Sequence, residues 1–275
     1  MATYFSSKRA FMTGITNAGG SIGSVIYPIV FRQLQPTLGF PWATRIIGFI
    51  ALGTLSISLS IMRMRTGAPR KPRALLDLKA FREAGFTIFS LGLFLTFVGL
   101  YFPFYYTSTY GSRIVGLSDN VSFYLLPAIN AGSIFGRIIP GLIADKIGSL
   151  NSIIPCGVAA AILAFAWLGI TDASGLWIFS VLYGFFSGAI VSLPATVVAL
   201  LSPDLSLVGT RMGMSFTFAG FGFLIGNPIA GAILNIPQGK FRGAQAFSAV
   251  TILAGAAAFI LVRVLLMKRR KGWKA

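Results

Sequence analysis

Eight long apolar segments alternate with polar ones along the chain, and this pattern sets the fold class. They cover residues 11–31, 42–62, 86–110, 121–144, 151–170, 175–201, 212–234 and 244–266. Each has about the 20 residues that an α-helix needs to cross the hydrocarbon core of a bilayer. Lipid offers no partners for free backbone N–H and C=O groups, so helices are expected rather than strands. We therefore predict an all-α integral membrane protein.

Composition supports this class and narrows the chemistry. Apolar residues make up 55% of the 275 residues and charged residues only 11%, against about 25% charged residues in soluble domains. There is no histidine, and the single Cys156 lies in an apolar segment, where a buried thiol is expected. No nucleophile–base pair and no metal-ligand cluster stands out. We expect neither an enzyme, nor a metal, nor a cofactor, and the first residues show no cleavable signal peptide.

The net charge of +17 is mostly a topology signal. With the N-terminus placed in the cytoplasm, the connections on that side hold seventeen Lys and Arg residues and those on the other side five. Positive residues concentrate on the cytoplasmic side of membrane proteins. Both termini are therefore expected in the cytoplasm, with the plasma membrane as the location. Binding to nucleic acid is not expected, because the charges flank apolar segments instead of forming a basic face.

Residues 63–85 form the longest polar segment. Pro69 and Pro72 interrupt any continuous helix there. The apolar residues that follow them recur at helical spacing: Ala74, Leu75, Leu78 and Phe81. Two compatible interpretations stay open, a short helix on the inner membrane surface with its cations near anionic headgroups, and a solvated linker between two helix bundles.

Arg137 is the ionisable side chain that falls near the middle of an apolar segment, 121–144. A charge at that depth is costly and usually serves a function or has a partner. Ser133 and Asn130 lie on the same helical face, one and two turns earlier. A guanidinium suits a carboxylate through two parallel hydrogen bonds, so we predict that these three residues bind substrate. The alternative is a structural arginine bound to backbone carbonyls of neighbouring helices.

The start of the chain carries a family motif. Tyr4, Phe5, Lys8 and Arg9 precede a run of small residues that includes Gly14 and Gly19. This stretch resembles the start of the fifth helix in monocarboxylate-transporter-like members of the major facilitator superfamily, of the fungal type. The small residues are expected to let another helix approach closely. Polar residues on one face of the segment either line a cavity or bond to another helix: Thr13, Asn17, Ser21 and Ser24.

A second motif, GLIADKIG at 141–148, ends the segment that contains Arg137. It resembles the loop signature that this superfamily carries between its eighth and ninth helices. The resemblance implies a conformational role for four residues and no contact with substrate: Gly141, Asp145, Lys146 and Gly148. The aspartate is expected to hold a neighbouring helix end, although the basic residues that usually follow are replaced by Ser149 and Asn151.

The resemblance implies a fold of twelve helices in two halves, of which this chain would hold about eight, the fifth to the twelfth. Residues 1–64 would be the last two helices of the first half, with a cytoplasmic linker at 65–85. Residues 86–266 would form the six-helix second half, followed by a basic tail at 267–275. The first four helices would be missing, through an incomplete gene model, a fragment or a shortened relative.

The same resemblance implies the function. The chain would be a secondary carrier, with Arg137 at the position where relatives bind the substrate carboxylate. The acid that relatives carry one turn earlier is replaced by Ser133, and all six acidic residues lie at segment ends or in loops. A small organic anion is therefore the expected substrate. Symport with a proton would need a proton-carrying group other than these carboxylates. The alternative is a truncated membrane protein that does not transport.

Overall fold

The computed structural model describes residues 5, 8–63, 75–236 and 238–269, and these are almost entirely helical. Tyr4, residues 64–74 of the polar segment 63–85, and the last residues of the basic tail lie outside the described residues. Seven helical segments in the described part are long and apolar enough to cross a membrane. The all-α membrane fold predicted from the apolar segments is confirmed.

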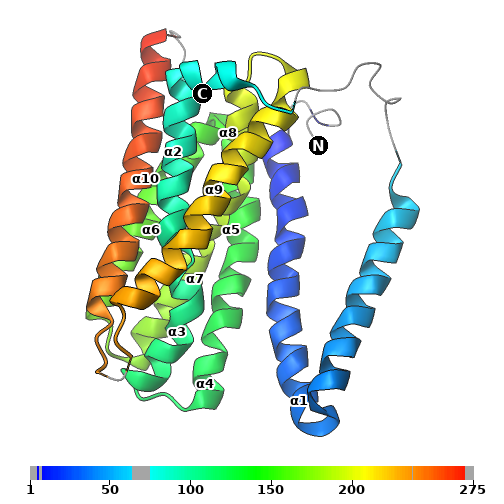
Figure 1. The fold of residues 1–275 in the computed structure, drawn as a ribbon, viewed down its shortest axis with the longest axis vertical. Coiled ribbons are helices and arrows are strands. Elements are labelled where there is room, and N and C mark those ends of the chain that lie inside the picture. Colours follow the sequence, from blue (N-terminus) through cyan, green and yellow to red (C-terminus); the bar gives the residue numbers. More distant parts are fainter. Residues whose placement is uncertain (1–4, 6–7, 64–74, 237, 270–275) are drawn as a thin grey trace.

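The first helical segment, α1 (Arg9–Ile61), contains two of the predicted spans. It runs for 53 residues, and Gly39 inside it has φ 73° and ψ 167°, which no helical residue adopts. The chain turns back at this glycine, because glycine alone takes such a conformation without strain. Figure 1 shows the result as two arms, a first arm (9–38) beside the bundle and a second arm (40–61) apart from it.

The other six spans match the predicted segments, and three of them bend near their middle or end. Proline in the first turn restarts the helix at two of these bends, Phe102–Pro103 and Pro194, where the missing N–H costs least. The helices are α2 (Ala84–Leu100), α3 (Phe102–Arg113), α4 (Asp119–Phe123), α5 (Leu125–Ile147), α6 (Ser149–Ala166) with the 3-10 turn η2 (Trp167–Gly169), α7 (Ala173–Ser192), α8 (Pro194–Leu201), α9 (Leu205–Ile233) and α10 (Arg242–Arg269).

Glycines set the spacing between the helices of the bundle. A Cβ on Gly132 would overlap the carbonyl oxygen of Val181, and one on Gly184 would overlap that of Ile129. These contacts bring α5 and α7 to backbone-to-backbone distance. Gly222 and Gly226 do the same for α9 against α2. Small residues are the usual means of close approach in membranes, where helix association depends on packing rather than on water exclusion.

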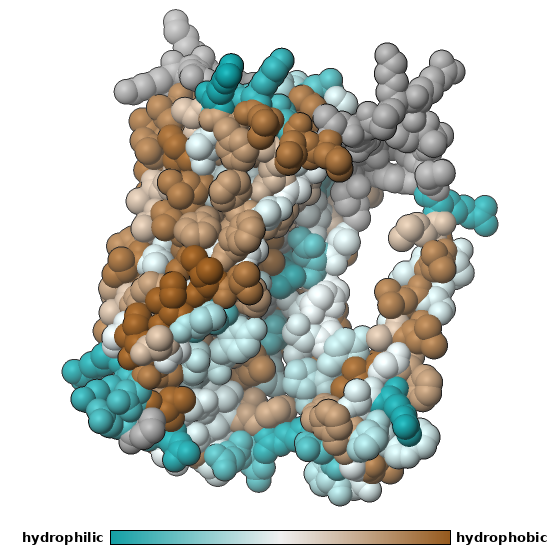
Figure 2. Space-filling model, in the orientation of Figure 1, coloured by the Kyte–Doolittle hydropathy of each residue, from teal (hydrophilic) through white to brown (hydrophobic). Residues whose placement is uncertain are grey.

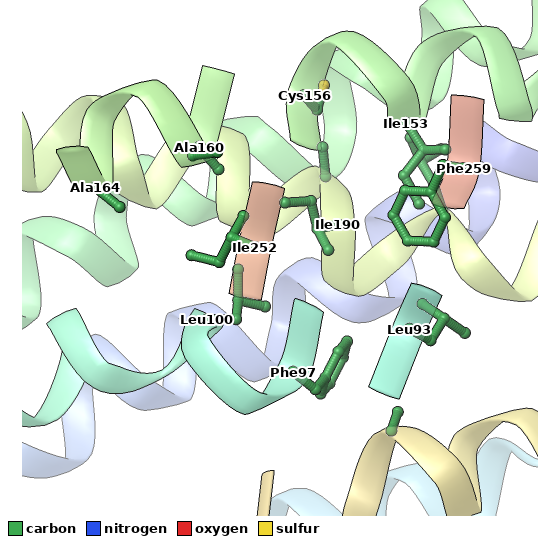
Figure 3. Close-up of a cluster of buried hydrophobic side chains, with 14 of the residues drawn as sticks. Leu93, Phe97, Leu100, Ile153, Cys156, Ala160, Ala164, Ile190, Ile252 and Phe259 are labelled. Carbon is green, nitrogen blue, oxygen red and sulfur yellow. The ribbon is translucent and has the colours of Figure 1, made fainter. Parts of the chain in front are cut away.

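The interior between these helices is filled by large apolar side chains. Figure 3 shows the part of the core where α2, α6, α7 and α10 meet, with Leu93, Ile153, Cys156 and Phe259 among its members. The thiol of Cys156 is buried, as predicted. Figure 2 shows apolar side chains over the middle of the bundle and hydrophilic ones at its two ends. This distribution fits a bilayer around the bundle.

The polar linker reaches the bundle through η1 (Leu78–Arg82), a short 3-10 helix. Ala80 is fully buried and Phe81 packs against the core, whereas Leu75 is 94% exposed. The buried guanidinium of Arg211 holds this segment. It donates to Asp77 at 2.9 Å and to both carboxylate oxygens of Glu83 at 2.9 and 2.6 Å. The sequence analysis missed this cluster.

Candidate functional site

The site lies along the seam between the first arm of α1 and α5. A Cβ on Gly14 would overlap the carbonyl oxygen of Arg137, and one on Gly141 would lie 2.8 Å from that of Ala10. The hydroxyls of Ser21 and Ser133 are hydrogen-bonded across the seam at 3.1 Å. The two helices therefore touch along their backbones, and the small residues at these positions explain why.

Arg137 extends from this seam into an open space. Its Nε donates to the hydroxyl of Ser133 at 3.2 Å, and its Nη1 donates to the carbonyl oxygen of Asn17 at 2.7 Å. Both acceptors are neutral. Within the described part of the chain, no carboxylate lies at ion-pair distance from this guanidinium. The arginine is thus positioned by two hydrogen bonds while its charge stays without a counter-ion from these residues.

The open space beside Arg137 is a cavity of about 430 Å³. The three residues predicted to bind substrate, Arg137, Ser133 and Asn130, all lie on its wall, and Ser24 from the first arm of α1 joins them. The amide of Asn130 also donates to the carbonyl of Leu126 at 3.0 Å, one turn back in α5. Five helices contribute the full lining: Ser24, Tyr27, Pro28, Tyr101, Phe104, Tyr105, Leu126, Asn130, Ser133, Arg137, Ser187, Val191 and Phe223.

Three aromatic residues of this wall were not predicted from the sequence. Tyr27 comes from the first arm of α1, Phe104 from α3 and Phe223 from α9. Tyr101, Phe104 and Tyr105 follow one another at a helical spacing, which is the one local signal that places them on a common face. The contribution of Phe223 has no such signal, because it depends on which helices are neighbours.

The second motif lies at one end of the seam, which we call the Asp145 end. The carboxylate of Asp145 accepts the backbone N–H of Ala10 at 2.9 Å and that of Phe11 at 3.0 Å. These N–H groups belong to the first turn of α1, where they have no helical acceptor and where the helix dipole favours a negative charge. Gly148, with φ 100°, turns the chain from α5 into α6. Lys146 is exposed.

Phe5, Lys8 and Arg9 of the first motif lie at the start of α1, near the same end of the seam. Arg9 donates through Nε to the carbonyl oxygen of Phe5 at 2.7 Å, and Lys8 directly precedes α1. Gly14 makes the close helix contact that was predicted. Gly19 does not, since a Cβ there would have nothing within 4 Å. Among the described residues, the face of α1 that carries Gly19 therefore meets no other helix.

The opposite end of the seam is closed by a contact that the sequence analysis did not identify. The guanidinium of Arg32 donates to the side-chain oxygen of Asn120. It also lies 4.1 Å from the ring centre of Phe123 in α4 and 5.9 Å from that of Tyr124. We call this the Arg32 end. The first arm of α1 is therefore bonded to the α4–α5 segment at both ends of the seam.

Comparison with known proteins gives this arrangement a family. The sequence model of the Major Facilitator Superfamily matches residues 1–183 and again 131–275. The MFS-type transporter dbaD of Emericella nidulans is 41% identical over 262 residues, which cover 95% of this chain and 58% of the relative. The aspyridones efflux protein apdF of the same fungus is 41% identical over 255 residues, or 92% and 52%.

A third relative is more distant. The agnestins efflux protein AgnL12 of Paecilomyces divaricatus is 34% identical over 264 residues, covering 96% of this chain and 60% of that protein. The chain thus spans a little over half the length of the curated relatives that it matches. The family model covers the whole chain between its two matches, and the seven apolar helical segments agree with it. The chain belongs to the Major Facilitator Superfamily.

Proposed function

We propose that this chain is part of a secondary carrier that moves a small organic anion, of the monocarboxylate type, by alternating access. The observation that carries the proposal is Arg137 on the wall of a cavity of about 430 Å³, with hydrogen bonds to neutral groups only. Two of the relatives are named as efflux proteins. Outward movement of the anion is therefore the direction that we propose.

The charge balance of the cavity supports an anionic substrate. All six acidic residues lie at helix ends or in connections. Asp172 and Asp204 cap the helices that follow them, and Asp145 accepts a hydrogen bond from the first turn of α1. Asp77 and Glu83 are bound by Arg211. The negative charge that balances Arg137 would then come from the bound anion, and a coupled proton would travel with a group other than these carboxylates.

The arrangement of helices supports a division of the chain in the manner of the superfamily. In this proposal, residues 1–64 are the last two helices of the first half and 65–85 a cytoplasmic linker. Residues 86–266 are the six helices of the second half, and 267–275 a basic cytoplasmic tail. The spans would correspond to the fifth to twelfth helices of the fold. Both termini would lie in the cytoplasm, with the plasma membrane as the location.

The Asp145 end supplies the conformational part of the proposal. Opening the cavity toward that end requires the first arm of α1 to leave α5, which breaks the two hydrogen bonds from Ala10 and Phe11 to Asp145. The carboxylate would therefore hold the closed state at this end. Gly141 keeps the helices close enough for this contact, and Gly148 fixes the turn that follows it.

A transport assay on three forms of the chain tests the proposal. Proteoliposomes are preloaded with radiolabelled lactate, benzoate or succinate, and release is followed for the wild type, Arg137→Gln and Arg242→Gln. Arg242 is an exposed arginine outside the cavity and serves as the matched control. For at least one acid, we expect faster release from the proteoliposomes than from loaded liposomes without protein. Loss of the charge-assisted hydrogen bonds in Arg137→Gln should lower the rate of this protein-dependent release roughly 10- to 100-fold.

Two results would contradict the proposal. Equal release by the wild type and Arg137→Gln would remove the substrate role of this arginine. No release of any acid above the liposome background would remove the carrier function of this chain and favour a membrane protein of the family that does not transport. Size-exclusion profiles of the three forms control for folding.

A further inference from the structure

The chemistry of the cavity wall narrows the class of anion. Five of the thirteen lining residues are aromatic, and four of them are joined by ring contacts. Tyr101 packs edge-on against Phe223 with ring centres 4.8 Å apart, and Phe104 lies 5.3 Å from Tyr101 on its other side. Tyr105 lies 6.4 Å from Phe223. These rings form one continuous aromatic surface, contributed by α3, α9 and the residue that joins α2 to α3.

The opposite wall presents hydrogen-bond donors for an acid group. The guanidinium of Arg137 uses Nε for Ser133 and one N–H of Nη1 for Asn17. Its Nη2 donates no hydrogen bond to any described residue, so the N–H groups of Nη2 and the second N–H of Nη1 remain as donors for a carboxylate. A planar guanidinium binds a planar carboxylate through two parallel hydrogen bonds. The positive charge also argues against an organic cation, which aromatic rings alone would attract.

The size of the cavity argues against a very small acid. Its volume of about 430 Å³ falls in the range of roughly 300–1,000 Å³ that is usual for pockets of drug-sized ligands. A three-carbon acid bound to Arg137 would leave the aromatic wall uncovered and most of the space empty. A ligand that reaches from Arg137 to Phe223 needs an apolar body of its own, and a flat ring system meets aromatic faces and edges in the arrangements that they prefer.

We propose that the substrate of this cavity is a planar aromatic anion, with its acid group on Arg137 and its ring system against Tyr101, Phe104 and Phe223. This inference rests on the proposed function, since it takes the cavity as the substrate site. It adds that the aromatic wall, and not the arginine, selects among anions. Arg137 binds any anion whose carboxylate reaches it, while the aromatic rings favour an anion with an aromatic ring system over a saturated anion of the same size.

Four probes separate the contributions of charge, shape and aromaticity. The chain in lipid nanodiscs is titrated with 2-naphthoate, with its saturated counterpart decahydro-2-naphthoate, with naphthalene-2-carboxamide and with propionate. The saturated acid keeps the charge and carbon skeleton, and the amide keeps the rings without the charge. We expect 2-naphthoate to bind about tenfold more tightly than the saturated acid, and both the amide and propionate to bind more weakly still.

Variants locate the two effects in the cavity. Phe223→Leu and Phe104→Leu should each reduce the preference for 2-naphthoate over the saturated acid by several-fold, while the affinity for the saturated acid stays within about twofold. Arg137→Gln should weaken both acids. Phe49→Leu is the matched control, because Phe49 lies on the second arm of α1 and is 62% exposed. It should leave all four affinities unchanged.

The outcomes distinguish this inference from the proposed function. Equal binding of the two bicyclic acids, with both weakened by Arg137→Gln, would overturn the aromatic selection and leave the anion site standing. Binding of neither acid would overturn the anion site and the inference with it. Should one phenylalanine variant fail to fold, the other variant and the comparison of probes on the wild type still decide the matter.

Discussion

Single residues decide how closely the helices of this protein approach one another. Gly184 in α7 faces the carbonyl oxygen of Ile129 in α5, and no room remains for a Cβ between them. Gly220 in α9 is also helical, yet a Cβ there would have nothing within 4 Å. The two glycines are alike in sequence terms and opposite in packing. They therefore make a matched pair for measuring what close approach contributes to stability.

We expect Gly184→Ala to destabilise the bundle by about 1–3 kcal/mol, because the added methyl group forces the α5 and α7 backbones apart. Gly220→Ala should instead stabilise it by about 0.4–1 kcal/mol, since alanine restricts the unfolded chain and meets no obstacle. Thermal unfolding of both variants in the same nanodiscs measures the difference. Equal shifts for the two would show that the α5–α7 spacing adapts freely.

At the same scale, residues show where sequence reasoning succeeds and where it stops. Arg137, Ser133 and Asn130 were assigned to one face because helical periodicity is a local property, and the structure brings all three to one cavity. Phe223 was not assigned, since its place on the wall depends on the neighbours of α9. Gly19 meets no other described helix, because a small residue permits close approach only on a face that another helix covers, and the sequence does not name that face.

At the scale of elements, the linker is fixed to the bundle by one buried cation. Arg211 in α9 is 1% exposed and binds carboxylates from both sides of η1, as well as the carbonyl of Leu201 at 3.2 Å. The ring of Phe86 lies 5.5 Å from its guanidinium carbon. One side chain thus joins the linker to α2, α8 and α9.

We expect Arg211→Met to destabilise this end of the bundle by about 2 kcal/mol or more, because Asp77 would be left nearly buried without a partner. The loss of stability should be smaller than for a fully buried ion pair that loses one partner, since the side chain of Glu83 is 42% exposed. Limited trypsin digestion reads the effect directly, through faster cleavage after Lys79 and Arg82. The exposed Arg242→Met is the control, and an unchanged cleavage rate in Arg211→Met would contradict the anchoring role.

The elements themselves were largely predictable, and for a physical reason. A run of apolar residues long enough to cross lipid identifies a span without reference to the rest of the chain. The predicted segment 121–144 therefore lies within an observed helical segment, and 151–170 ends one residue beyond another. The start of α9 was placed too late, at 212 instead of Leu205. Its first two turns mix apolar residues with Ser206, Thr210 and Arg211, and Asp204 caps the helix, which apolar length does not detect.

For the whole molecule, the distribution of charge predicts the orientation in the membrane. The described cations at the Asp145 end include Lys8, Arg9, Lys79, Arg82, Lys146 and Arg211, whereas those at the Arg32 end include Arg32, Arg113, Lys240 and Arg242. Figure 1 shows the beginning of α1 and the end of α10 at the same end of the bundle. This arrangement agrees with the expectation of two termini on one side, and the positive residues favour the cytoplasm for that side.

Accessibility to a membrane-impermeant maleimide tests this orientation. In a Cys156→Ser background, we expect Lys240→Cys, between α9 and α10, to react on intact cells. Pro203→Cys, between α8 and α9, should react only after the membrane is permeabilised. Both positions are exposed on the protein surface, so a difference in labelling reports the side of the membrane. The reverse pattern would invert the proposed topology.

Two chemically different contacts hold the two ends of the seam between the first arm of α1 and α5. At one end the carboxylate of Asp145 accepts two backbone N–H groups, and at the other the guanidinium of Arg32 lies over the ring of Phe123. A carrier that rocks about this seam must break the contact at one end while the contact at the other end stays intact, and the free energies of breaking the two contacts need not be equal. A difference between these free energies would make the substrate-free protein favour the state that is open to one side of the membrane.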